Sequence, residues 1–481
     1  MGGKRATVPL VGLLSLWLLG FVPAGAYVIE RVSVASDCSQ GNDESGRSGV
    51  SISADGRYVA FHSSASNLVA GDTNGCEDIF VHDRQTGQTT RVSVASDGSE
   101  GNYHSNSPSL SADGRYVAFA SGASNLVAGD TNNTYDIFVR DRSASETFRV
   151  SVAWAGNPSA NSNGSSNNPS LSADGRYVAF WSGASNLVAG DTNGDYDIFM
   201  HDRQTGQTMR VSIASDGSQG NGGSNSSSLS ADGRYVAFWS WASNLVAGDT
   251  NGIYDVFMHD CLTGQTTRVS VAGDGSEGNW GSVCPSLNAD GRHVAFSSGA
   301  SNLVPGDTNG NDDVFVHDCI TGQTTRVSVA GDGSQGDGYS GTYALSLSAD
   351  GRSVPFQSLS SNLVAGDTNG KPDVFVAINP LSPSSMRLPT RGWYLVSAPH
   401  EGDHPLATLE VARPSANRTM SFCDAVAAGW INPTLYAFDH DRFAYSTCSC
   451  DGPPIDDDNT LRQGQGYWLC TNVAGLTLVF P

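Results

Sequence analysis

A seven-residue pattern, D-T-N-G-x-x-D, recurs along the chain and places oxygen-bearing side chains at its positions 1, 3 and 7. Carboxylate and amide oxygens are the ligands that Ca²⁺ takes in proteins. The candidate calcium ligands are Asp72, Asn74, Asp78, Asp191, Asn193, Asp197, Asp249, Asn251, Asp255, Asp307, Asn309, Asp313, Asp367, Asn369 and Asp373. The pattern therefore predicts either a series of calcium sites or a series of polar turns.

The EF-hand arrangement of calcium ligands does not fit this pattern. An EF-hand loop needs glycine at position 6 and an acid at position 12, whereas the glycine here stands at position 4. The acid at position 12, Asp83, follows a predicted strand that spans roughly 16 Å, so it cannot close the same loop. We favour an Asx turn at Asn74-Gly75, with Asp78 bonding to the backbone where the next strand begins.

Calcium nevertheless stays open as a cofactor, because a second recurring loop can add ligands. The D-G-S-x-G-N loops should emerge on the same face of the fold as the D-T-N-G loops. They carry further carboxylates at Asp97, Asp216, Asp274 and Asp332. The alternatives are a protein without a cofactor and a calcium-binding surface protein.

Histidines also recur at one position of the chain's repeat, each directly before an aspartate: His82, His201, His259 and His317. A catalytic site needs one set of unlike residues, whereas copies of one residue in successive repeats lie far apart. We therefore interpret these histidines, and the repeated arginines and aspartates around them, as structural.

Aromatic side chains stand where the repeats differ from one another. Tyr103, His104, Trp280, Tyr339 and Tyr343 lie in or beside loops that lead into inner strands. Three further tyrosines precede the third strand of a repeat: Tyr135, Tyr196 and Tyr254. Exposed aromatic rings beside an acidic, Asn-rich face can stack on sugar rings or anchor a protein partner. The alternative is that each ring packs on its own repeat.

The chain contains no G-x-S-x-G, H-E-x-x-H or C-x-x-C motif and no phosphate-binding loop. The sequence thus gives no positive evidence for an enzyme. A lyase built on a repeat fold would escape such a search, because its acids and bases come from scattered repeats.

These residues must be positioned by one repeated unit, which runs from residue 27 to residue 380. It reads S-A-D-G-R-Y-V-A-F, A-S-N-L-V-A-G-D-T-N-G, D-I-F-V-H-D and T-G-Q-T-T-R-V-S-V-A. Its turn aspartates are Asp55, Asp113, Asp174, Asp232, Asp290 and Asp350, which lie 58, 61, 58, 58 and 60 residues apart. Repeats of this length that contain only strands and turns predict the blades of a β-propeller.

Four strands are expected in each copy. In the second copy the inner strand ends at residue 111, and further strands cover residues 116–119, 137–139 and 149–152. The middle strands are short apolar runs, as expected where neighbouring blades cover both faces of a sheet. The fold class is therefore all-β, with a six-bladed propeller of four-stranded blades.

The first and last copies differ from the others in a complementary way. The first R-V-S-V segment, residues 31–34, precedes the first S-A-D-G motif, and no such segment follows the third strand of the sixth copy at residues 374–376. We predict that residues 28–35 supply the outer strand of the sixth blade, which would close the ring and protect two sheet edges.

The motif S-A-D-G-R-Y-V-A-F followed by D-I-F-V-H-D resembles the WD40-like (PD40) repeat of TolB-like propellers, in which S-P-D-G-K-x-I-A-F precedes D-I-Y. The resemblance covers all six copies. This sequence departs from the family by alanine for proline in every S-A-D-G and by a longer loop between the second and third strands. The family implies protein binding in the periplasm or outside the cell. It also includes hydrolase-fused and lyase propellers, so the resemblance leaves binding and catalysis both open.

The N-terminus predicts export from the cytoplasm. Lys4 and Arg5 precede an apolar stretch at residues 8–22, and Ala24-Gly25-Ala26 offers a small-residue cleavage site. Residues 1–26 are therefore predicted to be a signal peptide, since the apolar stretch is shorter than the ~20 residues of a membrane span. We expect the mature protein, without an integral membrane segment, to be extracellular, on the cell surface or periplasmic.

The chain is strongly acidic, with a formal net charge of −22. The first 26 residues hold two of the 26 basic residues and no acidic ones, so the mature chain carries −24. Such a surface repels the phosphates of nucleic acids and anionic lipids, and it favours cations, basic partners or solubility. We therefore exclude nucleic acid as a partner.

Nine cysteines in an exported chain permit disulfides. Cys38 replaces the glycine of a D-G-S-Q-G-N loop, and Cys76 follows the first D-T-N-G. Both loops should lie on one face of the first blade. We therefore predict a disulfide between Cys38 and Cys76 that pins the strand closing the ring.

The repeat ends before a linker at residues 381–386, and residues 387–481 are predicted to form a second, small β-rich domain with disulfides. Its G-W-Y-L-V-S and L-R-Q-G-Q-G-Y-W-L segments resemble the G-W-N-L-V-S and L-x-x-G-x-G-Y-W-V modules of bacterial surface proteins. Its cysteines, Cys423, Cys448, Cys450 and Cys470, allow three pairings.

Two function classes follow from these observations. The first is a non-catalytic scaffold that binds a protein or an envelope glycan outside the cytoplasm. The second is a propeller-based polysaccharide-active enzyme, a lyase or hydrolase. An enzyme should gather unlike acid, base and aromatic residues in one asymmetric pocket, whereas a scaffold should present a shallow repeating face.

Overall fold

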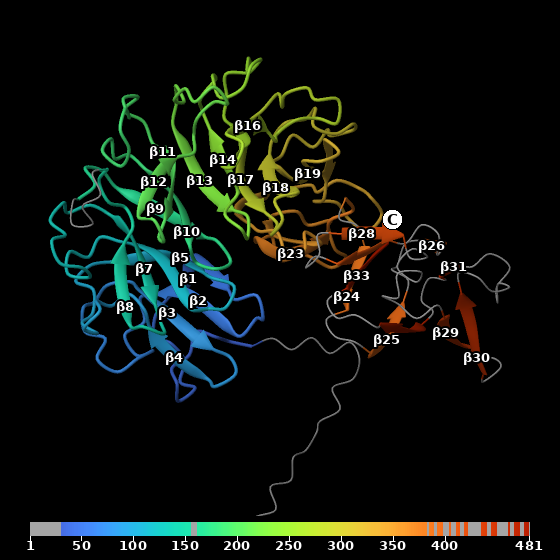
Figure 1. Cartoon of the computed structure of the whole chain (residues 1–481), viewed down its shortest axis with the longest axis horizontal. Coiled ribbons are helices and arrows are strands. Elements are labelled where there is room, and N and C mark those ends of the chain that lie inside the picture. The colour runs from blue at the N-terminus through green and yellow to red at the C-terminus, as the bar shows by residue number, and fades with distance from the viewer. Residues whose placement is uncertain are drawn as a thin grey trace, which may run out of the picture.

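The computed structural model describes residues 30–154 and 161–381, and beyond residue 381 it describes only a set of strands. The described residues form strands and no helix. Six antiparallel sheets, blades 1 to 6 in chain order, are arranged around a common centre (Figure 1). The predicted six-bladed propeller is confirmed. The predicted signal peptide, residues 1–26, lies outside the described residues.

Each blade is a meander whose strands follow one another from the centre outward. The innermost strands are β1 (Ser45–Ile52), β5 (Ser105–Leu110), β9 (Ser166–Leu171), β13 (Ser224–Leu229), β17 (Ser282–Leu287) and β21 (Ser340–Leu345). The second strands are β2 (Tyr58–Ser63), β6 (Tyr116–Ser121), β10 (Tyr177–Ser182), β14 (Tyr235–Ser240), β18 (His293–Ser298) and β22 (Ser353–Ser358).

The third strands are β3 (Asp78–Asp83), β7 (Asp136–Asp141), β11 (Asp197–Asp202), β15 (Asp255–Asp260), β19 (Asp313–Asp318) and β23 (Asp373–Ile378). The outer strands are β4 (Gln88–Arg91), β8 (Glu146–Arg149), β12 (Gln207–Arg210), β16 (Gln265–Arg268) and β20 (Gln323–Arg326). Blade 6 has three strands among the described residues.

The hydrophobic core lies between the blades. One cluster joins Ala60, Ile79 and Val81 of blade 1 to Phe119 and other apolar residues of blade 2, and the next four blade pairs have equivalent clusters. Within each blade, two phenylalanines of the second and third strands stack, with ring centroids 5.9 Å apart for Phe119 and Phe138. The apolar middle strands predicted from the sequence are thus buried because a neighbouring blade covers each face.

The S-A-D-G turn of each blade after the first packs against the preceding blade. Gly114 has a φ of 68°, and a Cβ atom there would lie 2.3 Å from Cδ2 of Tyr58 in blade 1. In the same turn, the backbone N–H of Ala54 donates to the carbonyl of Ala112 at 2.9 Å. Glycine is therefore required both by the left-handed backbone and by the close approach of the preceding blade.

A pair of alanine substitutions separates these two requirements. Gly175, in the S-A-D-G turn of blade 3, has a φ of 70° and would place a Cβ 2.3 Å from Tyr116. Gly206, in the outer turn of the same blade, has a φ of 72° and open space around it. Both substitutions strain the backbone by about 1–2 kcal/mol, and only Gly175→Ala adds about 1–3 kcal/mol of steric overlap.

Urea unfolding of both variants measures this difference. We expect Gly175→Ala to lose at least about 1 kcal/mol more stability than Gly206→Ala. Equal losses would show that the turn does not fix the distance between blades.

Five of the blade-to-blade junctions repeat the same hydrogen bonds. The N–H of one turn alanine donates to the carbonyl of the next at 2.9 Å, along the series Ala54, Ala112, Ala173, Ala231, Ala289 and Ala349. A leucine near the end of the inner strand also donates its backbone N–H to a serine of the preceding blade. In blade 2, the N–H of Leu110 donates to Ser51 Oγ at 2.9 Å. The described residues show no sixth junction, from blade 6 to blade 1.

The seam is the name we give to the open boundary between β23 of blade 6 and β1 of blade 1. The sequence predicts that residues 28–35 pair with β23 here, but residues 28 and 29 lie outside the described residues. The described remainder contacts blade 1 instead: Glu30 pairs with Arg84 at 2.8 Å, and the carbonyl of Val34 accepts from Thr89 Oγ1 at 2.5 Å. Among the described residues, this segment therefore does not pair with β23, and blade 6 has three strands.

Beyond residue 381 the chain is again built of strands. One sheet has the order β24-β33-β27-β28 and another β25-β32-β29-β30, with a separate ladder β26-β31. Their bounds are β24 (Ser384–Leu388), β25 (Gly392–Ser397), β26 (His404–Pro405), β27 (Glu410–Arg413), β28 (Arg418–Ser421), β29 (Thr434–Asp439), β30 (Ala444–Ser449), β31 (Thr460–Leu461), β32 (Gly466–Thr471) and β33 (Leu476–Phe480). The first strand begins inside the predicted linker. The predicted disulfides of this region fall outside the described side chains.

No helix in the part of the chain that the structure describes is long and apolar enough to cross a membrane.

Candidate functional site

The D-T-N-G loop has the predicted Asx turn. In blade 1, Oδ1 of Asn74 accepts a hydrogen bond from the N–H of Cys76 at 2.8 Å. The Asn74 amide nitrogen donates to Asp78 and to the carbonyl of Gly101, both at 2.9 Å. An amide nitrogen, and not an amide oxygen, therefore faces the carboxylate. The same contacts recur at Asn193, Asn251 and Asn309.

An arginine supplies the positive charge that the loop's carboxylates need. The guanidinium of Arg91, from the end of β4, lies 3.2 Å from Asp72 and 3.1 Å from Asp78. It also lies 2.9 Å from Glu100, in the loop that leads to the next blade. Arginines in the same place pair with the same two aspartates in the next four blades: Arg149, Arg210, Arg268 and Arg326.

This arrangement changes what the loop can do chemically. Burial raises the pKa of Asp72 and raises that of Asp249 to about 6, and the neighbouring guanidinium of Arg91 or Arg268 opposes this rise. Asp78 accepts a hydrogen bond from Ser93 Oγ at 2.5 Å. We predicted that this carboxylate would bond to the backbone, but the partners that the structure shows are side chains. Within the described ranges, no group of three or more His, Cys, Asp or Glu residues could hold a metal ion.

The D-T-N-G and D-G-S-x-G-N loops lie together, as predicted, but they join successive blades. The N–H of Thr73 in blade 1 donates to Glu100 at 3.1 Å, just before blade 2. Cys76 therefore lies beside the loop around residue 101, whereas Cys38 lies one blade earlier. The predicted disulfide between Cys38 and Cys76 is not formed in this structure, where both are free thiols.

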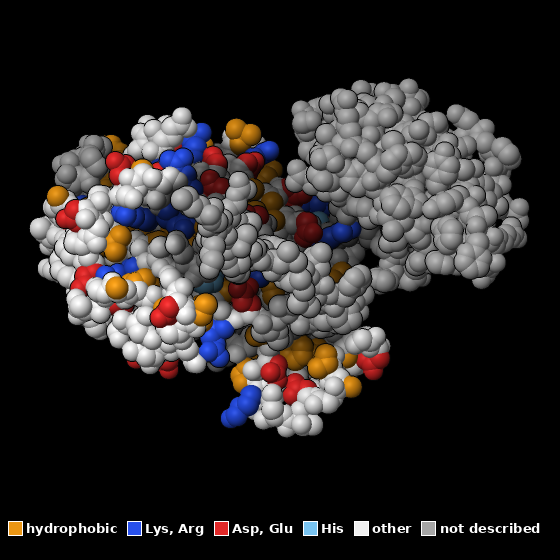
Figure 2. Space-filling model, turned by 90° about the horizontal axis from the view of Figure 1, so that it is seen from below, with side chains coloured by type: hydrophobic (Ala, Val, Ile, Leu, Met, Phe, Trp, Pro, Cys, Tyr) orange, Lys and Arg blue, Asp and Glu red, His pale blue; other side chains and the backbone are white. Residues whose placement is uncertain are grey.

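The opposite edge of blades 1 to 5 carries a second set of ion pairs. Arg115 contacts both carboxylate oxygens of Asp141, at 2.7 Å and 3.1 Å, and the hydrogen bond lowers the pKa of Asp141 to about 2. The repeated histidines lie buried nearby: Nδ1 of His201 is 2.9 Å from Thr208 Oγ1, and burial lowers the pKa of His201 to about 4. These contacts agree with the structural interpretation of the repeated residues. Basic and acidic side chains accordingly lie next to one another on the surface (Figure 2).

Exposed aromatic residues gather at one edge of the sheets. The start of the inner strand, the end of the second and the start of the third meet at this edge, because neighbouring strands are antiparallel. We define the aromatic face as Tyr103, Tyr196, Trp241, Trp280 and Tyr339, which are between 50% and 61% exposed. Four of these were predicted from the sequence. Tyr343 was also predicted to lie beside an inner strand, but its side chain lies outside the described residues.

His104 lies beside this face but has a partner in the preceding blade. Its Nδ1 accepts from the N–H of Glu77 at 3.0 Å, and its ring meets Tyr103 edge-on at 5.0 Å. Trp241 is a face residue that sequence reasoning missed. It stands where three other repeats have glycine, after the second strand, and that difference could have identified it.

Glycines support the rings of the aromatic face. A Cβ atom at Gly122 would lie 2.8 Å from the ring of Tyr103, and one at Gly299 would lie 2.6 Å from the ring of Trp280. The rings therefore rest directly on the backbone, and half of their surface stays open to solvent. Neighbouring rings hold them from the side, as Tyr254 does for Trp241 at 4.7 Å and 73°. The face thus offers fixed aromatic platforms.

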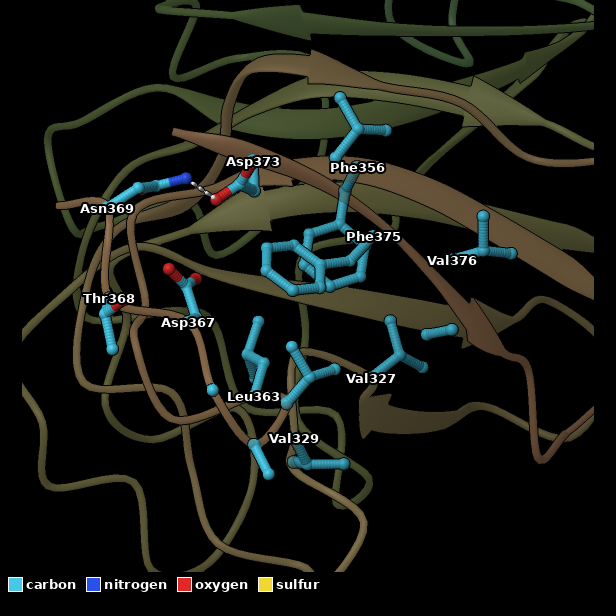
Figure 3. Close-up of a pocket in the computed structure, with 15 residues that line it drawn as sticks. Val327, Val329, Phe356, Leu363, Asp367, Thr368, Asn369, Asp373, Phe375 and Val376 are labelled. Carbon is cyan, nitrogen blue, oxygen red and sulfur yellow. Dashed lines mark hydrogen bonds between the residues drawn. The ribbon is translucent and has the colours of Figure 1, made fainter. Parts of the chain in front are cut away.

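A cavity of about 630 Å³ lies along the unpaired edge of β23. Phe356, Leu363 and Phe375 form its apolar floor, and Asp367 and Asp373 stand at one end (Figure 3). Asn369 donates to Asp373 at 2.8 Å, so this D-T-N-G loop has the geometry of the others. Within residues 161–381, however, no arginine pairs with its two aspartates.

No protein-family model matches the chain, and no curated protein matches it. The propeller is similar in fold to TolB of Acinetobacter baumannii, with 19% identity over 63% of this chain and a TM-score of 0.35. The match covers 60% of that TolB chain. A putative TolB of Agrobacterium tumefaciens matches at 13% identity over 71% of this chain and 92% of its own, with a TM-score of 0.38.

An enzyme is among the similar structures as well. An oligogalacturonate lyase of Vibrio parahaemolyticus matches at 13% identity over 71% of this chain and 92% of its own, with a TM-score of 0.34. The likeness in all three cases is one of fold. The assignment as a propeller rests on the strand pairing of this chain.

Proposed function

We propose that the mature protein is a non-catalytic binding scaffold outside the cytoplasm, and that its aromatic face holds a protein or an envelope glycan. The exposed rings of this face carry the proposal. Soluble proteins seldom leave several large aromatic rings half exposed at one edge of the fold without a partner. The predicted signal peptide supports a location outside the cytoplasm.

The polar residues of the repeat support binding rather than catalysis. In blades 1 to 5, the arginines, aspartates and histidines described above are engaged with partners of their own blade or the next one. The cavity on blade 6 is lined by apolar residues and a D-T-N-G loop, and its lining includes no histidine, lysine or cysteine. The ionisable groups among its lining residues are the carboxylates of Asp367 and Asp373, and Asp373 accepts a hydrogen bond from Asn369 as the equivalent aspartates of the other loops do from theirs.

The negative charge of the chain limits the chemical classes of partner that it can bind. At −22 overall, the protein repels polyanions, so neutral sugars, amino sugars and basic protein segments fit it better than uronic acid polymers. Each stacked ring contributes about 0.5–1.5 kcal/mol beyond the area that it buries. Several platforms together therefore suffice for a multivalent contact with an extended partner.

A triple variant tests this function. We expect Tyr196→Ala/Trp241→Ala/Trp280→Ala to weaken binding roughly 100-fold, since three lost platforms at about 1 kcal/mol each sum to that factor. The probes are an array of neutral, amino-sugar and uronic acid oligosaccharides, isolated peptidoglycan, and a library of basic peptides. Binding constants from surface plasmon resonance give the comparison.

The matched control removes exposed apolar side chains from the opposite edge of the sheets. Leu262 and Ile320 are 75% and 74% exposed in the turns between third and outer strands, so Leu262→Ala/Ile320→Ala should bind like the wild type. If the control loses as much affinity as the triple variant, or if the triple variant binds normally, the aromatic face is not the binding site.

A further inference from the structure

The aromatic face changes its chemistry at the junction between blades 5 and 6. The residue just before the third strand is a tyrosine in blades 2, 3 and 4, and each of these rings contacts another aromatic ring: Tyr135, Tyr196 and Tyr254. Blade 5 has a carboxylate, Asp312, at this position. One part of the aromatic face therefore combines an exposed ring with a negative charge.

Asp312 and Trp280 meet over one glycine. A Cβ atom at Gly299 would lie 2.6 Å from Cδ1 and 3.2 Å from Nε1 of Trp280, and 2.9 Å from Oδ1 of Asp312. The carboxylate therefore lies by the pyrrole side of the indole, and Trp280 is 61% exposed. Glycine leaves the space in which the two groups can lie together.

A second aromatic residue of the face lies near Asp312. The carbonyl of Asp312 accepts from the N–H of Ser340 at 2.8 Å, a contact that joins blade 5 to the start of β21. Tyr339 directly precedes Ser340 and is 51% exposed. Exposed aromatic residues thus approach this carboxylate from two successive blades.

Asp312 has no positively charged partner among the described residues. Its neighbours on the same loop, Asp307 and Asp313, both pair with Arg326, at 3.1 Å and 3.2 Å. The side chain of Asp312 points away from that arginine, because side chains alternate along an extended chain. Its Oδ2 accepts from Thr342 Oγ1 at 3.1 Å, and its Oδ1, the oxygen beside the indole, has no donor among the described residues.

The free groups at this place define the ligand that fits them. A carboxylate beside an aromatic ring attracts an ammonium or guanidinium group. The indole N–H of Trp280, for which the described residues offer no acceptor, needs an oxygen. Lysine and arginine side chains carry donors only. An amino sugar has an ammonium group, hydroxyl oxygens next to it and an apolar ring face that stacks on an indole, so it uses all three features.

We infer, on the basis of the proposed function of the aromatic face, that Trp280 and Asp312 form a subsite for an amino sugar with a free ammonium group. The sugar ring stacks on the exposed indole, its ammonium group contacts Oδ1 of Asp312, and one of its hydroxyl oxygens accepts from the indole N–H. Tyr339 offers a platform to the next sugar of the chain. The partner is then a glycan that carries free amino groups rather than acetylated ones.

A matched pair of oligosaccharides tests this subsite. The linear tetrasaccharides of glucosamine and of N-acetylglucosamine have the same backbone, and only the first carries ammonium groups at mildly acidic pH. We expect the full chain to bind the glucosamine form about fivefold more tightly, the factor for one contact between opposite charges at a partly exposed site. Surface plasmon resonance at low ionic strength, where the charge of Asp312 is least screened, gives both binding constants.

Two variants separate the carboxylate from the ring. Asp312→Asn keeps the shape of the side chain and removes its charge, so the preference for the glucosamine form should fall to less than about twofold. Trp280→Ala should weaken the binding of both oligosaccharides, by roughly fivefold for one lost platform. The control Glu77→Gln removes a carboxylate from the same repeat position in blade 1, which lies 3.9 Å from Nδ1 of His104, and should keep the preference of the wild type.

The outcomes distinguish this subsite from the proposed function. Equal affinity for both oligosaccharides, weakened in Trp280→Ala, would overturn the amino-sugar subsite and leave the binding role of the face intact. Equal loss of the preference in Asp312→Asn and Glu77→Gln would trace it to the overall charge and also overturn the subsite. Binding of lysine-rich peptides through Trp280, with neither oligosaccharide bound, would make the partner a protein. Failure of every probe to bind would contradict the proposed function as well.

Discussion

Replacing Arg149 with methionine should lower the free energy of unfolding by about 3–5 kcal/mol at pH 7, because it leaves buried carboxylates without a counter-charge. The Arg149 side chain is 1% exposed and lies 3.2 Å from Asp130 and 3.5 Å from Asp136, which are 4% and 0% exposed. Methionine keeps the apolar stem of arginine and removes its charge. The loss therefore measures the ion pair rather than a cavity.

The pH dependence of this loss identifies its cause. Burial already raises the pKa of Asp130, and Arg149 opposes that rise. Without the guanidinium the folded-state pKa rises further above the unfolded value near 4. A carboxyl with a raised folded pKa costs stability above its unfolded pKa, and this cost disappears as the pH falls. Urea unfolding at pH 7 and pH 4.5 should show the variant approach the wild type at the lower pH.

The control is an ion pair of the same residue types whose arginine is largely exposed. Arg115→Met removes the partner of Asp141, but the Arg115 side chain is 44% exposed. Asp141 has a folded pKa of about 2, so the pair stabilises the fold above pH 4 and ceases to do so as the pH falls toward 2. We expect a smaller loss that does not change between pH 7 and pH 4.5. Equal losses in both variants would contradict the role given to burial.

The fold could be predicted from the sequence because each copy of the repeat carries its own turn and strand signals. Asp113-Gly114 marks a turn, and the runs around Phe119 and Phe138 mark strands that are covered on both faces. The boundary of the outer strand was less predictable. It ends at Arg149 and not at residue 152. The N–H of Val150 still donates to the carbonyl of Ile137, but the N–H of Ile137 donates to the side-chain Oγ of Ser151 and not to a backbone carbonyl of the outer strand.

The ionic network of the D-T-N-G loops could not be predicted from spacing alone. Carboxylates and amides at positions 1, 3 and 7 are compatible with calcium, and nothing local shows that an arginine from β4 returns to the same place. The absence of the predicted disulfide between Cys38 and Cys76 has a related cause. Cys76 belongs to the D-T-N-G loop of blade 1 and Cys38 to the loop that precedes this blade, but a D-T-N-G loop contacts the loop that follows its blade. Such contacts depend on how successive blades pack, which a single repeat does not encode.

Alanine in place of Phe138 should cost about 3–5 kcal/mol, the usual loss for a fully buried phenylalanine. Phe138 lies in the core between blades 1 and 2, with an exposed fraction of 0%. Its equivalent in blade 6 is Phe375, which stacks on Phe356 at the same 5.9 Å but lines the open cavity. The two positions thus differ only in whether an outer strand covers them.

The cost of Phe375→Ala therefore depends on the state of the seam. In the open ring part of the Phe375 ring already faces solvent, so its removal should cost clearly less than the loss at Phe138. Urea unfolding of both variants measures the two losses. Equal losses would show that Phe375 is covered in solution as Phe138 is.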